Sequence, residues 1–214
     1  LIMPLMRKER PVRQPVTSMS RRRLLQAAAS RLTLLVPGTA VAAAAPTAAQ
    51  PRGPFYPDRI PLDKDNDLVR VDGREGTAAG EITDLQGRVL DPNGRPVGGA
   101  LVEIWQCDAN GRYIHRLDDR RVPRDPKFQG YGRFETTSDG RYGFRTIKPV
   151  PYPGRAPHIH VAVRVPGSRP LVTQIYVKGA RENQWDWLLN AVGDDATRER
   201  LIIDFEPAAD ARTA

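Results

Sequence analysis

The sequence predicts an all-β protein, a two-sheet antiparallel β-sandwich with long loops and one short helix. Its 214 residues contain 18 glycines and 20 prolines, which separate a series of short apolar runs. Within these runs apolar and polar side chains alternate, as expected where one face of a strand is buried. Only residues 182–192 repeat apolar side chains at helical spacing. Six or more short strands with almost no helix favour two packed sheets.

Two turns predict hairpins between strands that are neighbours in the chain. The segment Asp91-Pro92-Asn93-Gly94 connects the first two expected strands, and Asn-Gly readily adopts the positive φ angles of a tight turn. Ser138-Asp139-Gly140 connects the next two in the same way. The expected strands are 81–90, 100–106, 133–137, 141–147, 158–165, 171–177 and 201–205.

The basic residues are concentrated at the N-terminus. Residues 1–49 contain eight arginines and lysines against one glutamate, so they account for +7 of the net charge of +8. The rest of the chain is therefore almost neutral. A nucleic-acid-binding domain needs its basic surplus on the folded surface, where it displaces counterions from phosphates. The charge distribution therefore argues against a nucleic-acid partner.

Residues 1–49 have the features of an export signal. Ser20-Arg21-Arg22-Arg23-Leu24-Leu25 matches the twin-arginine pattern that directs folded bacterial proteins across a membrane. A weakly apolar stretch follows at 24–36, and either Ala40-Val41-Ala42 or Ala42-Ala43-Ala44 offers small residues for cleavage. Met19 is the expected natural start. The predicted organisation is a signal region at 1–49 and one β-sandwich domain at 50–214. A disordered basic tail is the alternative interpretation.

The signal predicts a periplasmic or extracellular protein whose precursor uses the twin-arginine export machinery. The stretch at 24–36 contains Arg31 and is too polar for a membrane span, which takes about 20 apolar residues, so stable membrane anchoring is not expected. Cys107 is the only cysteine, which excludes an intrachain disulfide. It is interpreted as a small buried residue, with a thiolate metal ligand or a nucleophile as the alternative.

His158 and His160 are the first candidates for a functional site. Because the two histidines are two residues apart on an expected strand, their side chains project from the same face of the sheet. Ile159 and Val161 alternate with them and are expected in the core. Two adjacent imidazoles often form half of a metal site, although the same spacing also occurs in histidines that only pack.

Tyr152 lies close to these histidines, within Pro149-Val150-Pro151-Tyr152-Pro153. Proline fixes φ and removes a backbone donor, so this segment is expected to be a rigid loop that holds the tyrosine in place. No carboxylate or thiol occupies a comparable position, which disfavours the two-histidine-one-carboxylate iron(II) site and the common zinc sites. An aromatic lid over the core is the alternative role for Tyr152.

Five segments, in order, resemble the intradiol ring-cleavage dioxygenase family, which includes protocatechuate- and catechol-cleaving enzymes. Together they extend over about residues 53–206. The segments are Gly53-Pro54-Phe55-Tyr56-Pro57, residues 101–113, residues 142–153, Arg155-Ala156-Pro157-His158-Ile159-His160, and Leu171-Val172-Thr173-Gln174-Ile175-Tyr176. Residues 52–80 show no helical period, unlike the long N-terminal helical region of the catechol 1,2-cleaving branch, so the chain is more similar to a protocatechuate-cleaving subunit.

The resemblance implies a ferric ion, Fe(3+), bound by Tyr113, Tyr152, His158 and His160. A phenol has an unperturbed pKa of about 10, and a trivalent cation lowers that pKa until the phenolate is the stable form. The implied reaction opens a catechol-type ring between its two hydroxyl-bearing carbons with O2 and gives a muconate-type diacid. Tyr152 is implied as the ligand that the substrate displaces and that accepts a proton.

The resemblance also implies roles for two further side chains. Arg155 matches the arginine that stabilises negative charge on the reacting ring, and Gln174 matches a glutamine near the open coordination position. A surface salt bridge and an exposed strand position are the alternatives for these two residues. His115 is interpreted as a pocket-rim or surface residue, because the family takes both histidine ligands from the later pair.

The segment between Tyr152 and His158 is short. Residues 153–157 stand where the well-known protocatechuate and catechol enzymes carry a longer insertion that helps to wall the pocket. A more open site is therefore expected, and the sequence does not identify the ring substituents of the substrate. It also leaves the oligomeric state open, a homo-oligomer included.

Two other functions are compatible with parts of the sequence. A non-catalytic, transthyretin-like β-sandwich binding module would share the hairpin at 87–97, but it has no reason to carry two tyrosines beside His158 and His160. A zinc-dependent periplasmic hydrolase would use the same histidines but lacks an evident carboxylate base. Iron content and the red-brown colour of tyrosinate bound to iron(III) discriminate between these functions.

Overall fold

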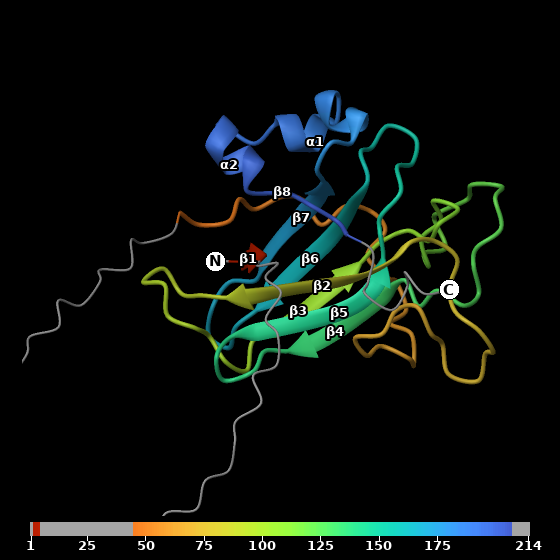
Figure 1. The fold of residues 1–214 in the computed structure, drawn as a ribbon, viewed down its shortest axis with the longest axis horizontal. Coiled ribbons are helices and arrows are strands. Elements are labelled where there is room, and N and C mark those ends of the chain that lie inside the picture. The colour runs from red at the N-terminus through yellow and green to blue at the C-terminus, as the bar shows by residue number, and fades with distance from the viewer. Residues whose placement is uncertain (1, 5–44, 207–214) are drawn as a thin grey trace, which may run out of the picture.

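A computed structural model describes residues 2–4 and 45–206, and its strands form two sheets (Figure 1). A three-stranded sheet has the order β1-β2-β5, and a five-stranded sheet has the order β4-β3-β6-β7-β8. The strands are β1 (Ile2–Pro4), β2 (Ile82–Val89), β3 (Leu101–Trp105), β4 (Tyr131–Glu135), β5 (Arg141–Ile147), β6 (His158–Arg164), β7 (Leu171–Val177) and β8 (Ile202–Ile203). The predicted all-β sandwich is confirmed. The predicted signal motif lies outside the described residues.

The main core lies between the two sheets, because each sheet contributes one apolar face. Ile159 and Val161 of β6 face this core, as their alternation with the histidines predicted. Burial of each such aliphatic side chain contributes about 1.5–3 kcal/mol to folding. The cluster joins both sheets and includes Leu85, Val89, Val102, Ile104, Phe144, Ile159, Val161 and Val163.

Both predicted hairpins are wrong in their strand pairing. The Asp91–Gly94 turn does form, with Gly94 N–H donating to the Asp91 carbonyl at 3.0 Å, but the returning chain makes a single bridge and then crosses to the other sheet. There β3 pairs along both edges, with β4 and with β6. In the same way β4 and β5 lie in different sheets although a tight turn joins them. The strands separate because their apolar faces then cover each other across the core.

The C-terminal part of the chain differs from the prediction in two ways. The single helix expected at 182–192 is replaced by a 3₁₀ turn (Arg181–Gln184) and α1 (Trp187–Asn190), because the Asp186 side chain caps α1 and starts a new helix there. A further short helix that was not predicted, α2 (Asp195–Glu199), follows. The final strand β8 pairs parallel to β7, not antiparallel, since the helices form a crossover between the two. No helix in the described part of the chain is long and apolar enough to cross a membrane.

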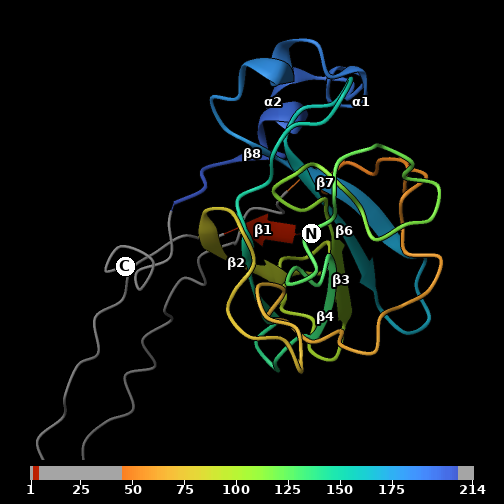
Figure 2. The same ribbon diagram turned by 90° about the vertical axis from the view of Figure 1, so that its right-hand side faces the viewer.

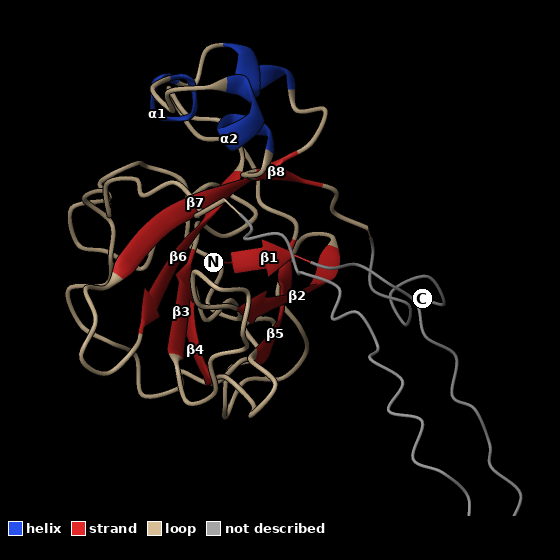
Figure 3. Ribbon diagram, turned by 90° about the vertical axis from the view of Figure 1, so that its left-hand side faces the viewer, coloured by secondary structure: helices blue, strands red, loops and turns tan. Residues whose placement is uncertain are grey.

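The outer face of the five-stranded sheet is also covered. The segment that begins at residue 45 (orange) and the loop that follows β3 (green) lie on the side of the molecule away from β2 (Figure 2). They contribute aromatic side chains to a second buried cluster, which includes Trp105, Tyr113, Tyr131, Phe55, Tyr56 and Tyr152. The helices gather at one end of the sheets, beside β7 and β8 (Figure 3). This covered outer face holds the candidate site.

Candidate metal centre

Strands β3, β6 and β7 place the two histidines on the outer face of the five-stranded sheet. His158 and His160 alternate with core residues along β6, and both are almost completely buried. In the pairing register His160 lies between Trp105 of β3 and Gln174 of β7. The Trp105 ring stacks on the His160 ring, with centroids 4.7 Å apart and planes 6° from parallel. Stacking therefore fixes the plane of the His160 ring.

The two imidazoles present nitrogen atoms to each other. His158 Nδ1 lies 2.6 Å from the carbonyl oxygen of Ala156, and because a carbonyl only accepts, Nδ1 carries the proton. His158 Nε2 therefore presents a lone pair, and it lies 3.1 Å from His160 Nε2. Burial, assisted by the positive charge of Arg155, lowers the pKa of His158 to about 4, and burial also lowers the pKa of His160. Both rings are thus neutral near neutral pH, the form in which imidazole binds a metal.

Tyr113 directs its hydroxyl toward these histidines from the loop after β3. Its side chain is buried, and Tyr113 Oη lies 3.4 Å from His158 Nε2. The backbone N–H of Tyr113 donates to the Asp118 carboxylate at 2.7 Å, and its ring stacks on Phe55 with centroids 5.0 Å apart. Burial raises the pKa of the Tyr113 phenol well above its ordinary value. A phenolate at this position therefore requires a cation beside it.

A tight turn brings Tyr152 and Arg155 together. The Arg155 N–H donates to the Tyr152 carbonyl at 2.9 Å, and Gly154 between them has φ +80°. Proline followed by glycine at positive φ is the pattern of a type II turn, which favours glycine at that position. The Tyr152 ring lies 5.6 Å from the Tyr113 ring and 5.5 Å from the His158 ring, centroid to centroid. The four predicted ligand side chains therefore meet at one place.

The Arg155 side chain reaches the same place, and each of its three guanidinium nitrogens faces a hydrogen-bond partner. Nη2 donates to Gln174 Oε1 at 2.6 Å, Nη1 faces Tyr152 Oη at 3.4 Å, and Nε donates to Asp186 Oδ2 at 2.9 Å. Gln174 is fully buried, which excludes an exposed strand position. The ion pair that Arg155 makes is a buried one, since its side chain is 10 % exposed. The structure thus places Arg155 and Gln174 beside the candidate ligands, and their catalytic roles stay predictions.

The donor atoms fit a ferric ion. Within the described residues no three His, Cys, Asp or Glu side chains gather at one point, so a metal here depends on the tyrosines. Tyr113 Oη and His160 Nε2 lie 3.4 and 3.1 Å from His158 Nε2. Ligand atoms held at about 2.1 Å from one ion and at right angles to each other lie about 3.0 Å apart, so this is the spacing of neighbouring ligands. Phenolate oxygens are hard anionic donors, which suits a hard trivalent cation.

Two side chains near the site are not among its donors. Cys107 is buried, as predicted, and its Sγ lies 3.7 Å from the Val150 carbonyl. Burial raises the pKa of the Cys107 thiol to about 12, so the thiolate is not accessible at neutral pH. His115 is partly buried, and its Nδ1 accepts from the Leu117 N–H at 3.1 Å. It faces its own loop, in agreement with a position at the rim.

The sequence did not reveal the residues that hold the ligands. Asp118 binds Arg120 through both carboxylate oxygens, and the Arg120 guanidinium lies 4.9 Å from the centre of the Tyr152 ring. Gln50 donates to Tyr176 Oη at 3.2 Å and accepts from the Gln174 N–H at 3.1 Å. The Asp118–Arg120 pair is local, but the other contacts join segments far apart in the chain and leave no local pattern. Trp105 lies within the strand expected at 100–106, but nothing in the sequence indicates that it stacks on His160.

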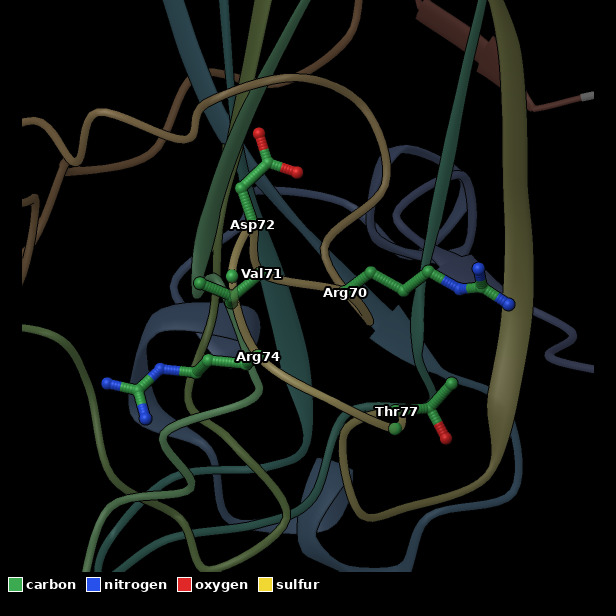
Figure 4. Close-up of a pocket in the computed structure, with 7 residues that line it drawn as sticks. Arg70, Val71, Asp72, Arg74 and Thr77 are labelled. Atoms are coloured by element: carbon green, nitrogen blue, oxygen red, sulfur yellow. The ribbon is translucent and has the colours of Figure 1, made fainter.

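A separate hollow of about 310 Å³ lies in the loop at residues 70–77. Figure 4 shows Arg70 and Arg74 pointing to opposite sides of it, and Asp72 pointing away from both. Charged groups that diverge do not form a converging donor set for one ligand. This hollow therefore offers no alternative to the candidate metal centre.

The fold and the site together define a β-sandwich with two tyrosines and two histidines converging on the outer face of one sheet. Residues 52–214 match the protein family described as dioxygenase. With the curated relatives, which carry names of ring-cleaving dioxygenases, this match shows that the chain belongs to the intradiol ring-cleavage dioxygenase family.

Two curated relatives and one solved structure illustrate the similarity. The chain is 43% identical over 157 residues to the protocatechuate 3,4-dioxygenase beta chain of Burkholderia cepacia, covering 69% of this chain and 65% of the relative. It is 33% identical over 174 residues to hydroxyquinol 1,2-dioxygenase of Nocardioides simplex, covering 72% and 53%. The dioxygenase domain of a dioxygenase carbohydrate-binding fusion from Streptomyces sp. SirexAA-E superimposes with a TM-score of 0.59 at 30% identity, covering 77% and 91%. The chain thus spans between about half and two thirds of these curated relatives.

Proposed function

We propose that the chain is a non-haem iron(III) dioxygenase that cleaves a catechol-type ring between its two hydroxyl-bearing carbons and forms a muconate-type diacid. The observation that carries this proposal is the convergence of two phenols and two neutral imidazoles in a buried site. Tyr113, Tyr152, His158 and His160 would hold the metal. The curated relatives named for protocatechuate and hydroxyquinol support a catechol-type substrate, and they differ in the ring substituent.

The two tyrosines have different environments and are proposed to act differently. Iron(III), when bound, supplies Lewis acidity that favours the anionic form of the catechol. Tyr113 is 2 % exposed and is held by its backbone bond to Asp118, so it stays in place. Tyr152 is partly exposed, on a turn with an exposed glycine. Its Oη is therefore the oxygen within reach of an incoming substrate hydroxyl, from which it accepts a proton.

Arg155 supplies a positive charge beside the Tyr152 hydroxyl. Its Nη1 faces Tyr152 Oη, so a substrate ring that took the place of the Tyr152 hydroxyl would lie in front of this N–H. A fixed donor aimed at developing negative charge is among the largest contributions to catalysis. The guanidinium is shielded from water, which keeps this charge weakly screened.

Iron content, colour and oxygen uptake test this function. Full-length protein purified after expression with iron is expected to contain stoichiometric iron and to be red-brown, because phenolate-to-iron(III) charge transfer absorbs visible light. Oxygen uptake is expected with a panel of catechols that includes protocatechuate and hydroxyquinol, and not with the same rings carrying one methylated hydroxyl. A folded, colourless protein without iron would overturn the proposal. Bound zinc together with hydrolase activity would favour the alternative enzyme class.

We also propose that the chain is exported by the twin-arginine route and acts in the periplasm or outside the cell. The support is the motif at 20–25, together with a folded domain that needs no disulfide. Replacing Arg21 and Arg22 by lysine is expected to leave the protein in the cytoplasmic fraction, while replacing Arg31 by lysine is not. Equal export of the two variants, measured by fractionation and immunoblot, would contradict this route.

A further inference from the structure

Asp186 is fully buried at the start of α1 and uses both carboxylate oxygens. Oδ1 accepts from the N–H groups of Leu188 and Leu189 at 3.1 and 3.0 Å, which caps the helix. Oδ2 accepts from Arg155 Nε at 2.9 Å and from the Ala156 N–H at 2.8 Å. One oxygen thus serves the helix, and the other serves the segment just before β6.

The bond from Arg155 to Asp186 sets the direction of the guanidinium. This group is a planar, rigid fork, so a partner on Nε fixes where its two Nη atoms point. Nη2 then donates to Gln174 Oε1 at 2.6 Å, and Nη1 faces Tyr152 Oη at 3.4 Å. Asp186 therefore determines which edge of Arg155 is turned toward the candidate ligands.

The bond from Ala156 to Asp186 acts on a histidine. The Ala156 carbonyl accepts from His158 Nδ1 at 2.6 Å, while the N–H of the same residue is held by Asp186. Holding Ala156 on its N–H side restricts the direction of its carbonyl. The partner of the second ring nitrogen fixes the tautomer and ring orientation of a metal-binding histidine. Asp186 is thus linked to His158 through one residue.

We propose that Asp186 is a positioning residue of the reaction, a role that rests on the proposed iron(III) site. Asp186 orients Arg155 directly and His158 through Ala156. The bonds of its Oδ2 go to Arg155 and Ala156, and it acts on the site through these two residues. Helix capping alone does not account for its burial, because α1 has four residues and the cap uses one oxygen. Asp194 provides the comparison, since it caps α2 through the Thr197 N–H at 2.8 Å and is exposed.

The substitution Asp186→Asn tests the positioning role. Asparagine keeps an acceptor oxygen for the helix cap but turns an amide NH2 toward Arg155 Nε and the Ala156 N–H, which are both donors. With iron and colour retained, kcat is expected to fall about a hundredfold and KM to change less than about threefold, as for a catalytic group displaced by about 1 Å. Asp194→Asn, the matched helix-cap control, is expected to keep the wild-type kcat. Equal kcat values for the two variants would overturn the proposal.

A double variant separates positioning from a general loss of structure. Because Asp186 acts largely through Arg155, adding Asp186→Asn to Arg155→Gln is expected to lower kcat by far less than the hundredfold expected in the wild-type background. If the two losses multiply, Asp186 does not act through Arg155 and the proposal fails. Should Asp186→Asn not fold, Asp186→Ser replaces it, since serine is also a good helix cap. If both unfold while Asp194→Asn folds, Asp186 is a structural residue only.

A measurement on the iron-free protein distinguishes failure of this proposal from failure of the proposed function. The Nε–H resonance of Arg155, assigned by its absence in Arg155→Gln, is expected to exchange slowly in the wild type. It is expected to shift and exchange faster in Asp186→Asn, and to stay unchanged in Asp194→Asn. An unchanged resonance in Asp186→Asn overturns the positioning role. A colourless, iron-free wild type overturns the iron(III) function instead.

Discussion

Replacing Tyr113 by phenylalanine is expected to abolish ring cleavage and to release most of the bound iron, together with the visible absorption band. The variant deletes one of two anionic donors at a position that is 2 % exposed, where water has little access to replace the lost oxygen. Losing a group that only supports a metal ligand lowers metal affinity about 10–100-fold, and losing a ligand lowers it at least as much. Elemental analysis of iron per chain and visible absorption measure the effect.

Two tyrosines provide controls for this variant. Tyr142 is buried in the core between the two sheets, on the opposite side of the five-stranded sheet from the histidines, so Tyr142→Phe is expected to keep iron and colour. Tyr152→Phe is expected to shift the absorption band but to lose less iron, because Tyr113 stays in place. If Tyr113→Phe keeps the wild-type spectrum and iron content, the ligand assignment is wrong.

Local patterns predicted the strands and the histidines, because these depend on short-range geometry. The strand expected at 171–177 agrees with β7 residue for residue. The two-residue spacing of His158 and His160 was enough to place both on one face, since side chains alternate along any strand. Tyr113 and Tyr152 lie in loops. The proline-rich segment placed Tyr152 near the histidines in the sequence, but the role of both tyrosines as ligands followed mainly from the family resemblance.

Strand pairing could not be predicted, because it is decided by the burial of whole faces. The Asp91–Gly94 turn has hairpin chemistry and closes as expected, yet the strands on either side join different sheets. The stacking of Trp105 on His160 depends on the register between β3 and β6, which no local signal reveals. The bond between Arg155 and Asp186 likewise joins residues 31 positions apart. The residues that support the site are therefore the part that requires a structure.

Replacing Arg155 by glutamine is expected to lower kcat about 10²–10³-fold, the range for removing one donor aimed at developing negative charge. Iron and colour are expected to be retained, since the four candidate ligands are untouched. The same variant leaves the carboxylate of Asp186 buried without its cation, which costs about 3 kcal/mol of unfolding free energy. Arg155→Lys is expected to recover part of that stability but little of the rate, because an ammonium lacks the fork that reaches Asp186 and Tyr152 together.

Arg164 separates the catalytic effect from the structural one. It also pairs with a buried carboxylate, through Arg164 Nε and Glu103 Oε2 at 2.6 Å, but it lies at the far end of β6 from His158. Its side chain is 46 % exposed, so Arg164→Gln is expected to cost about 1 kcal/mol and to leave kcat unchanged. Denaturant unfolding and steady-state kinetics on the two variants give both quantities. If kcat of Arg155→Gln equals that of Arg164→Gln, Arg155 serves only as the ion-pair partner of Asp186, and the charge that stabilises the reacting ring must come from elsewhere.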